Sequence, residues 1–305
     1  MNLMPADAPM IDCQQLFRGL IDEPSARQQF ALTPDSGLPE MASQIIAQDS
    51  YCYASVARAA AAILRIERDM GQFVQDHIEH QLWVHKRRAL WLSGRIQSES
   101  DAGLRWRVDG EENRRATEGH PTILISPMML PYEDALWISS QMLSPREAVI
   151  YGEGLAPDEM YSQVQKVFGL ETMRLADQPR AILRVLRQGG VFLTYPDFTY
   201  ESHLAQHVQF FGMRWPMSSG FISICSQPGT LLTPAYLAHE AAEVVIHVGE
   251  PVEVELPAGG QTDKRWTQHL VGAAIARMLE ELVLRNPAQW QLLPTLVAHC
   301  SQRAK

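Results

Sequence analysis

The chain has 305 residues, of which 46% are hydrophobic, and it carries a formal net charge of −9. This is enough apolar material for one large or two small buried cores, and nothing in the composition indicates disorder. The acidic balance argues against nucleic acid as a partner, because neutralising phosphates requires an excess of Lys and Arg. It also opposes long-range attraction to an anionic membrane.

The cysteines and the N-terminal segment indicate the compartment. The four cysteines show neither CxxC spacing nor the density of a disulfide scaffold, so we expect reduced thiols, no metal site and no cofactor. The N-terminus lacks the basic start and apolar run of a secretory signal, and no run of about 18 apolar residues occurs. These features predict a cytoplasmic protein without a transmembrane segment.

Residues 1–95 have the apolar spacing of helices, whereas residues 94–119 are charged and interrupted by glycines. We therefore expect a loop or hinge over 94–119 and place a domain boundary near residue 116. This divides the chain into a helical prefix with a charged linker, 1–115, and a second domain, 116–305. The arginines of the linker are better explained as a solvated face than as a docking site.

Beyond residue 116, short β-branched runs alternate with helical stretches. The predicted strands are 122–126, 148–151, 190–195, 231–235 and 244–248, and the predicted helices are 157–167, 180–187 and 266–285. Such alternation is typical of βαβ units. The expected fold class is α/β, with a mainly parallel central sheet flanked by helices and an α-helical N-terminal prefix.

Three segments of the second domain carry a family resemblance. They are Leu193–Ser219, with a Pro-Asp turn and a V-x-F-F-G element, Gly220–Ala235, and Glu280–Trp290, which reads EELVLRNPAQW. In this order and spacing they resemble the glycerolipid and lipid A acyltransferase superfamily, which includes phosphatidylinositol mannoside acyltransferases. The third segment departs from the pattern, because one residue instead of two separates Arg285 from Pro287 and Ala288 replaces a glutamate.

The resemblance implies a catalytic motif of a histidine, four further residues and then Asp or Glu, placed just after a strand. In that motif the imidazole takes a proton from the acceptor while the carboxylate orients the ring. Here the carboxylate is Glu133, in SPMMLPYED, and the histidine position is occupied by Met128. A methionine accepts no proton at physiological pH, so the usual dyad is incomplete.

Three explanations remain open for this gap. In the first, His203 or His207 supplies the base from the loop after the 190–195 strand, since the carboxyl ends of parallel strands share one edge of a sheet. In the second, Glu133 or Asp134 acts alone, with Asp197 as a further carboxylate nearby. In the third, catalysis is lost, and the apolar replacement at Met128 fits a lipid pocket or a packed core.

The leading hypothesis is an acyltransferase-like protein in a specialised biosynthetic pathway. It would move an acyl group from a carrier-protein or coenzyme A thioester to a small amine, hydroxyl or lipid acceptor. The alternative is a catalytically inactive module that binds acyl chains, lipids or a carrier protein. A serine hydrolase using Ser126 or Ser219 is a third possibility, although neither serine lies in a G-x-S-x-G elbow. The residues expected to contact substrate are Met128, Met129, Phe210, Phe211 and Ser219.

Overall fold

The computed structural model describes eleven stretches of the chain. They are residues 15–48, 53–67, 69–131, 133–135, 137–138, 148–151, 172–173, 179–197, 205–240, 243–253 and 264–302. Two compact units can be distinguished, one formed by Met1–Gln97 with Asn286–Lys305 and the other by Ser98–Arg285. The division therefore lies at 97/98, ahead of the boundary expected near 116, and the C-terminal segment belongs to the helical unit.

The first unit is built from helices, as the apolar spacing predicts. They are α1 (Gln15–Ile21), α2 (Pro24–Ala31), η1 (Asp35–Gly37), α3 (Leu38–Gln48), α4 (Tyr53–Ile63), α5 (Met70–Leu92), η2 (Pro287–Gln289) and α13 (Leu293–Gln302). Asp69 caps the start of α5, where its carboxylate accepts the Gln72 N–H at 2.9 Å. Phe73, Ile78 and Leu82 of α5 are fully buried in the core of this unit.

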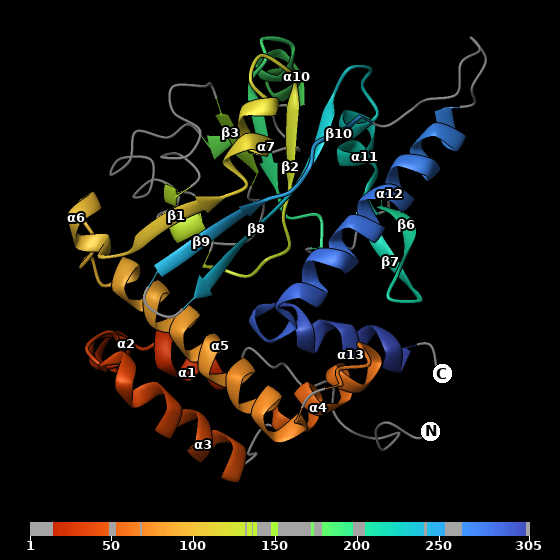
Figure 1. Ribbon diagram of the computed structural model, residues 1–305. Helices are drawn as coiled ribbons and strands as arrows, with labels where there is room; N and C mark the ends of the chain where they lie inside the picture. The colour runs from red at the N-terminus through yellow and green to blue at the C-terminus, as the bar shows by residue number, and fades with distance from the viewer. Residues whose placement is uncertain are drawn as a thin grey trace. The chain divides into compact units, whose positions relative to one another are not determined.

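The second unit is organised around a mixed, mostly parallel sheet (Figure 1). Its strands are β1 (Arg105–Asp109), β2 (Thr122–Ile125), β3 (Ala148–Tyr151), β4 (Thr172–Met173), β5 (Val191–Thr194), β8 (Leu231–Glu240), β9 (Glu243–Val248) and β10 (Val252–Glu253). The order is β1-β9-β8-β2-β5-β3-β4, with β10 also paired to β8. The pairs of β8 with β9 and β10 are antiparallel, and the others are parallel. The predicted fold class is confirmed at this level.

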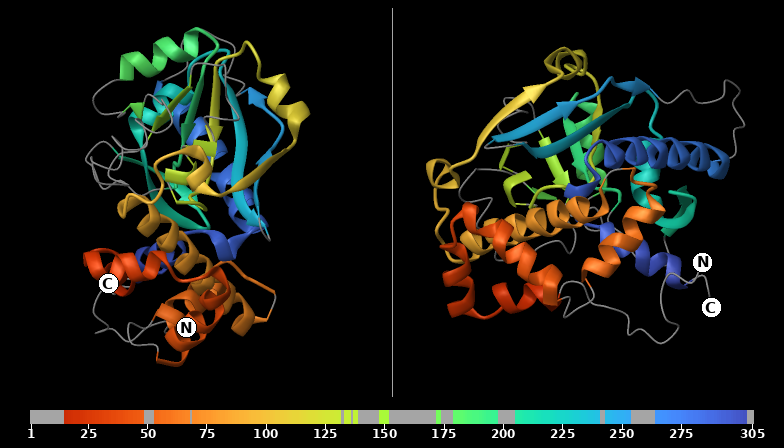
Figure 2. Two further views of the ribbon diagram at one scale, coloured as in Figure 1. Left: turned by 90° about the vertical axis from the view of Figure 1, so that its left-hand side faces the viewer. Right: turned by 60° about the horizontal axis from the view of Figure 1, so that its bottom comes forward.

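Helices flank the sheet, and a separate hairpin lies beside the longest of them (Figures 1 and 2). The helices of this unit are α6 (Glu99–Ala102), α7 (Glu111–Ala116), α10 (Pro179–Arg187), α11 (Ser219–Cys225) and α12 (Lys264–Arg285), and the hairpin is β6 (Ala205–Phe210) with β7 (Met213–Ser218). All four residues of β2 and of β5 are buried, as expected for central strands covered on both faces. The helix predicted at 157–167 lies outside the described residues.

The expectation of a loop over 94–119 is wrong for much of that stretch. Within it, β1 pairs in parallel with β9, and in the chain α6 precedes β1 and α7 follows it. The side chains of β1 alternate between exposed and half-buried positions because it is the edge strand of the sheet. Charged residues such as Arg105 and Arg107 are common on edge strands, where they oppose unwanted pairing with other chains. The charge of this segment therefore marks a sheet edge.

Among the residues that the structure describes, no helix combines the length and apolar character needed to cross a membrane. Cys225, on α11, is a free and buried thiol, and burial raises its pKa well above the ordinary value.

Candidate functional site

The segment after β2 leads into the interior of the second unit. Met128, Met129 and Leu130 are all buried, and Glu133 and Asp134 follow them with no exposed surface. Burying carboxylates is costly unless they have partners, so their position after a central strand distinguishes them from the surface acids of this chain. The carboxylate predicted from the motif spacing therefore lies at the carboxyl end of β2.

Asp197 and Tyr195 lie at the matching end of β5, which is the neighbour of β2. Both side chains are buried, and the carboxylate Oδ2 of Asp197 accepts the backbone N–H of Met128 at 2.9 Å. The indole Nε1 of Trp215, on β7, donates to the Asp197 carbonyl oxygen at 3.3 Å. Asp197 thus connects the segment after β2, the turn after β5 and the β6–β7 hairpin.

The negative charges of two buried carboxylates act on the phenol of Tyr195. Burial raises the pKa of its phenol above the ordinary value, and the negative charges of Asp197 and Glu133 raise it further. The hydroxyl therefore remains protonated at every physiological pH and can serve as a hydrogen-bond donor. We call Glu133, Asp197 and Tyr195 the acid–tyrosine cluster.

The structure describes only one of the two histidines that were predicted as a replacement base. His203 lies outside the described residues. His207 is exposed on β6, and its ring Nδ1 is 3.2 Å from a guanidinium nitrogen of Arg214, on β7. Because a guanidinium only donates, this ring nitrogen is the acceptor. His207 therefore lies on a solvent-facing surface, whereas Glu133 is buried.

The residues predicted to contact substrate occupy varied settings. Met128 is 7% exposed, and Met129 packs in the core against Tyr236, Ala238 and Leu282. Phe210 is buried against Trp215, with ring centroids 5.1 Å apart, and Phe211 is half-buried at the hairpin turn. Ser219 is half-buried at the start of α11. Met129 and Phe210 are therefore core residues in this structure.

One of the two serines considered as a hydrolase nucleophile, Ser126, is completely buried. Ser126 donates its hydroxyl to the Pro127 carbonyl oxygen at 3.2 Å. Its environment is that of a packed side chain, so this position gives the hydrolase hypothesis no support.

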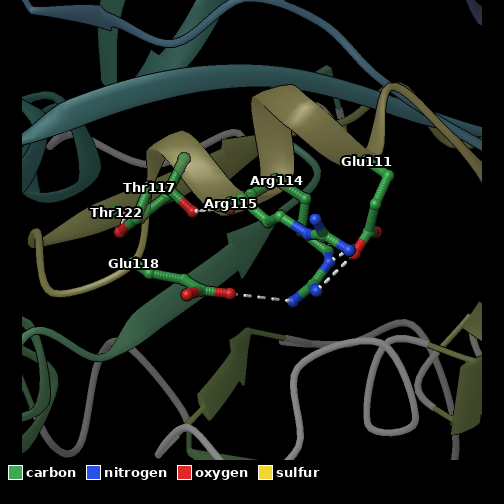
Figure 3. Close-up of polar contacts among 6 residues, drawn as sticks. All are labelled: Glu111, Arg114, Arg115, Thr117, Glu118 and Thr122. Atoms are coloured by element: carbon green, nitrogen blue, oxygen red, sulfur yellow. Dashed lines mark hydrogen bonds and ion pairs between the residues drawn. The ribbon is translucent and has the colours of Figure 1, made fainter.

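Two arginines of α7, Arg114 and Arg115, pair with glutamates that are close to them in the chain. The guanidinium of Arg114 contacts Glu111 at 2.6 Å and Glu118 at 3.6 Å, and Arg115 contacts Glu111 at 3.2 Å (Figure 3). The hydrogen bond from Arg114 is the main reason that the pKa of Glu111 falls to about 2. This arrangement agrees with the prediction of a solvated face.

Within the described part of the chain, no group of three or more His, Cys, Asp or Glu side chains is placed to hold a metal.

Sequence reasoning missed Tyr195 and Trp215. Tyr195 ends an apolar strand, and its position next to the Pro196-Asp197 turn was the available signal. Trp215 follows the hairpin turn, and only the pairing of β6 with β7 brings it to Asp197.

The sequence matches no model of a known protein family, and no curated protein is significantly similar to it.

Proposed function

We propose that this chain is a divergent acyltransferase-like protein that moves an acyl group from a thioester to a small amine or hydroxyl acceptor. The observation that supports the proposal is the acid–tyrosine cluster at the carboxyl ends of β2 and β5. Ligands of open α/β sheets bind at this edge. The resemblance of three segments to the lipid A acyltransferase superfamily supplies the reaction class.

In the proposed reaction the acceptor nitrogen or oxygen attacks the thioester carbonyl carbon. A new C–N or C–O bond forms, and the C–S bond breaks. The Glu133 carboxylate takes the proton that the acceptor loses and returns it to the sulfur, so that a thiol leaves. The Tyr195 hydroxyl donates to the carbonyl oxygen while negative charge develops there. A primary amine, which is a good nucleophile, depends least on the missing histidine.

The experiment follows thiol release from acyl thioesters in the presence of a panel of amine and alcohol acceptors. We expect Glu133→Gln to lower kcat by about 10²–10⁴, the usual contribution of a general base. We expect Tyr195→Phe to lower kcat by about 10²–10³, as for the loss of an oxyanion donor. Glu250→Gln is the matched control, because Glu250 is exposed after β9. Thioester that stays intact across the whole panel would refute the proposal.

A second candidate is a catalytically inactive binding protein. It is favoured by the burial of Met128 and Met129 in the positions where the family motif begins. This candidate predicts stoichiometric complexes with lipids or a carrier protein, detectable by native mass spectrometry, without turnover. Several turnovers per molecule would exclude it.

A further inference from the structure

We propose that Arg180, Arg184 and Arg187, on the outer face of α10, form a docking surface for an acidic helix of the carrier protein that delivers the thioester, an inference that rests on the acyl transfer proposed above. Such a surface selects a carrier protein over coenzyme A as the donor. We call these three residues the arginine stripe.

The sequence of α10 places apolar and basic residues on two different faces. Its nine residues read PRAILRVLR, and Ile182, Val185 and Leu186 are buried. The three arginines are exposed and are separated by four and three residues, so they share one face of the helix. With a rise of about 1.5 Å per residue, the arginine stripe extends about 10 Å along the surface.

The arginine stripe differs in its charge environment from the arginines of β1 and α7. Arg107, Arg114 and Arg115 each pair with a glutamate. The helix α10 contains no Asp or Glu, and within the described part of the chain no carboxylate forms an ion pair with the stripe. Three unpaired guanidinium groups on one face create a local positive potential that attracts an acidic surface. Because screening limits exposed charges to about 8 Å at physiological ionic strength, this local charge outweighs the net charge of −9 for a partner in contact.

The position of α10 on the outside of the sheet favours a protein partner (Figures 1 and 2). The outer face of a helix is convex, whereas sites for small molecules are concave and enclose most of the ligand. Coenzyme A would leave most of its surface in solvent there. An acidic helix lying along the arginine stripe can instead present carboxylates one turn apart, and each guanidinium can hold a carboxylate through two parallel hydrogen bonds.

The chain topology connects the arginine stripe to the proposed reaction centre. The helix α10 packs on β3 and β5, and only residues 188–190 separate its end from the start of β5. Because β3, β4 and β5 are parallel, a helix that crosses from β4 to β5 runs antiparallel to them. The start of α10, with Arg180, therefore lies towards the carboxyl edge of the sheet, where β5 leads into Tyr195 and Asp197. A carrier protein held on the arginine stripe would lie beside the edge at which the thioester reacts.

Binding of the full chain to a holo-acyl carrier protein, which is acidic and helical, tests the surface by biolayer interferometry at low and high salt. We expect the triple variant Arg180→Ala, Arg184→Ala, Arg187→Ala to lower the association rate constant by about tenfold or more at low salt. The difference should shrink at high salt, because screening removes the attraction. Arg184→Glu alone should also slow association, and a carrier protein with its acidic helix residues changed to lysine should restore part of the rate.

A matched triple variant removes the same total charge at other places on the second unit. It changes three exposed arginines to alanine: Arg105, Arg115 and Arg277. Both triple variants alter the net charge equally, so only an effect of location separates them, and we expect a much smaller change in the control. Circular dichroism checks that each variant is folded.

Equal association rates of the wild type and the arginine-stripe variant would overturn the inference, and so would the absence of carrier-protein binding to the wild type. It would also be overturned if the arginine stripe affected binding of coenzyme A, a DNA duplex or phosphatidylglycerol vesicles but not of the carrier protein. If the carrier protein binds through the stripe but its acyl form releases no thiol, the docking surface stands and the transfer reaction fails. If thiol is released with the same KM for acyl carrier protein in both proteins, the reaction stands and the surface fails.

Discussion

At the scale of single residues, Met128 is joined to the acid–tyrosine cluster through its backbone. Its side chain is buried, and its backbone N–H is held by the Asp197 carboxylate. This hydrogen bond uses the backbone, so it does not depend on which side chain stands at 128. A histidine at this position would stand five residues before Glu133, as in the motif of the acyltransferase superfamily that the chain resembles.

We predict that Met128→His raises the rate of transfer to hydroxyl acceptors by up to about 10²–10⁴, because it restores the general base of the motif. It should also lower the free energy of unfolding by about 1–3 kcal/mol, the usual cost of burying a polar group in a site shaped for an apolar one. Thiol release and urea unfolding measure the two effects. Met129→His is the control, because Met129 is also buried but packs against Tyr236 and Leu282. An equal gain in activity in both variants would contradict the prediction.

At the scale of elements, the turn of the β6–β7 hairpin is backbone-strained. Phe210 pairs with Met213, and the two residues between them, Phe211 and Gly212, have φ angles of 48° and 71°. Such values are required by a type I′ turn, but a bulky side chain rarely adopts them. The backbone N–H of Phe211 donates to the carboxylate of Glu280, on α12. This contact connects the V-x-F-F-G element with the C-terminal segment of the family resemblance.

We predict that Glu280→Ala lowers the free energy of unfolding by about 1–3 kcal/mol, because it removes a hydrogen bond to a charged acceptor from a strained turn. The adjacent Glu281 is exposed and gives a matched control, Glu281→Ala, for which we expect a change within about 0.5 kcal/mol. Chemical unfolding followed by tryptophan fluorescence measures both. Equal losses in the two variants would show that the Glu280 contact contributes nothing specific.

At the scale of the whole molecule, the strand and helix alternation of the second unit was predictable from apolar runs. The edge strand β1 was not, because its half-exposed residues are as charged as those of a loop. The sequence also did not predict that the C-terminal segment belongs to the helical unit. It depends on long-range contacts such as the one between His77 of α5 and the Ala288 carbonyl oxygen, 2.7 Å apart. No local pattern records such a pairing.

The candidate site was predictable to a similar extent. Motif spacing and strand position were enough to place Glu133 and Asp197 at one edge of the sheet. They were not enough to place His207, because a shift of one residue along a strand moves a side chain to the opposite face. Only the register of β6 with β7 shows that His207 lies on the exposed face with Arg214.

Two histidines of the helical unit, His77 and His85, make stability depend on pH. His77 is fully buried between the Tyr53 hydroxyl, at 3.1 Å, and the Ala288 carbonyl oxygen, and burial lowers its pKa to about 4. Burial and the charge of Arg88 lower the pKa of His85 to about 3. Since both folded-state values lie below the ordinary 6.5, the unfolded chain binds more protons in acid. Stability is therefore highest above about pH 6.5 and falls as pH decreases, towards about 4 for His77 and about 3 for His85.

We predict a loss of roughly 2 kcal/mol for each of these histidines between pH 7 and pH 5, from the free energy of about 1.4 kcal/mol per pKa unit. Urea unfolding followed by the helical circular dichroism signal measures it. His77→Gln should reduce the dependence on pH, whereas the exposed His207→Gln should leave it unchanged. A wild-type stability that is the same at both pH values would contradict this account.

We propose that the acid–tyrosine cluster supports acyl transfer. The most direct measurement is the amount of acylated acceptor, identified by mass spectrometry, that the wild type, Glu133→Gln and Glu250→Gln form from the same thioester. We predict a product whose rate of formation falls by about 10²–10⁴ in Glu133→Gln alone. The absence of acylated acceptor with the wild type, or equal rates in all three proteins, would contradict the claim.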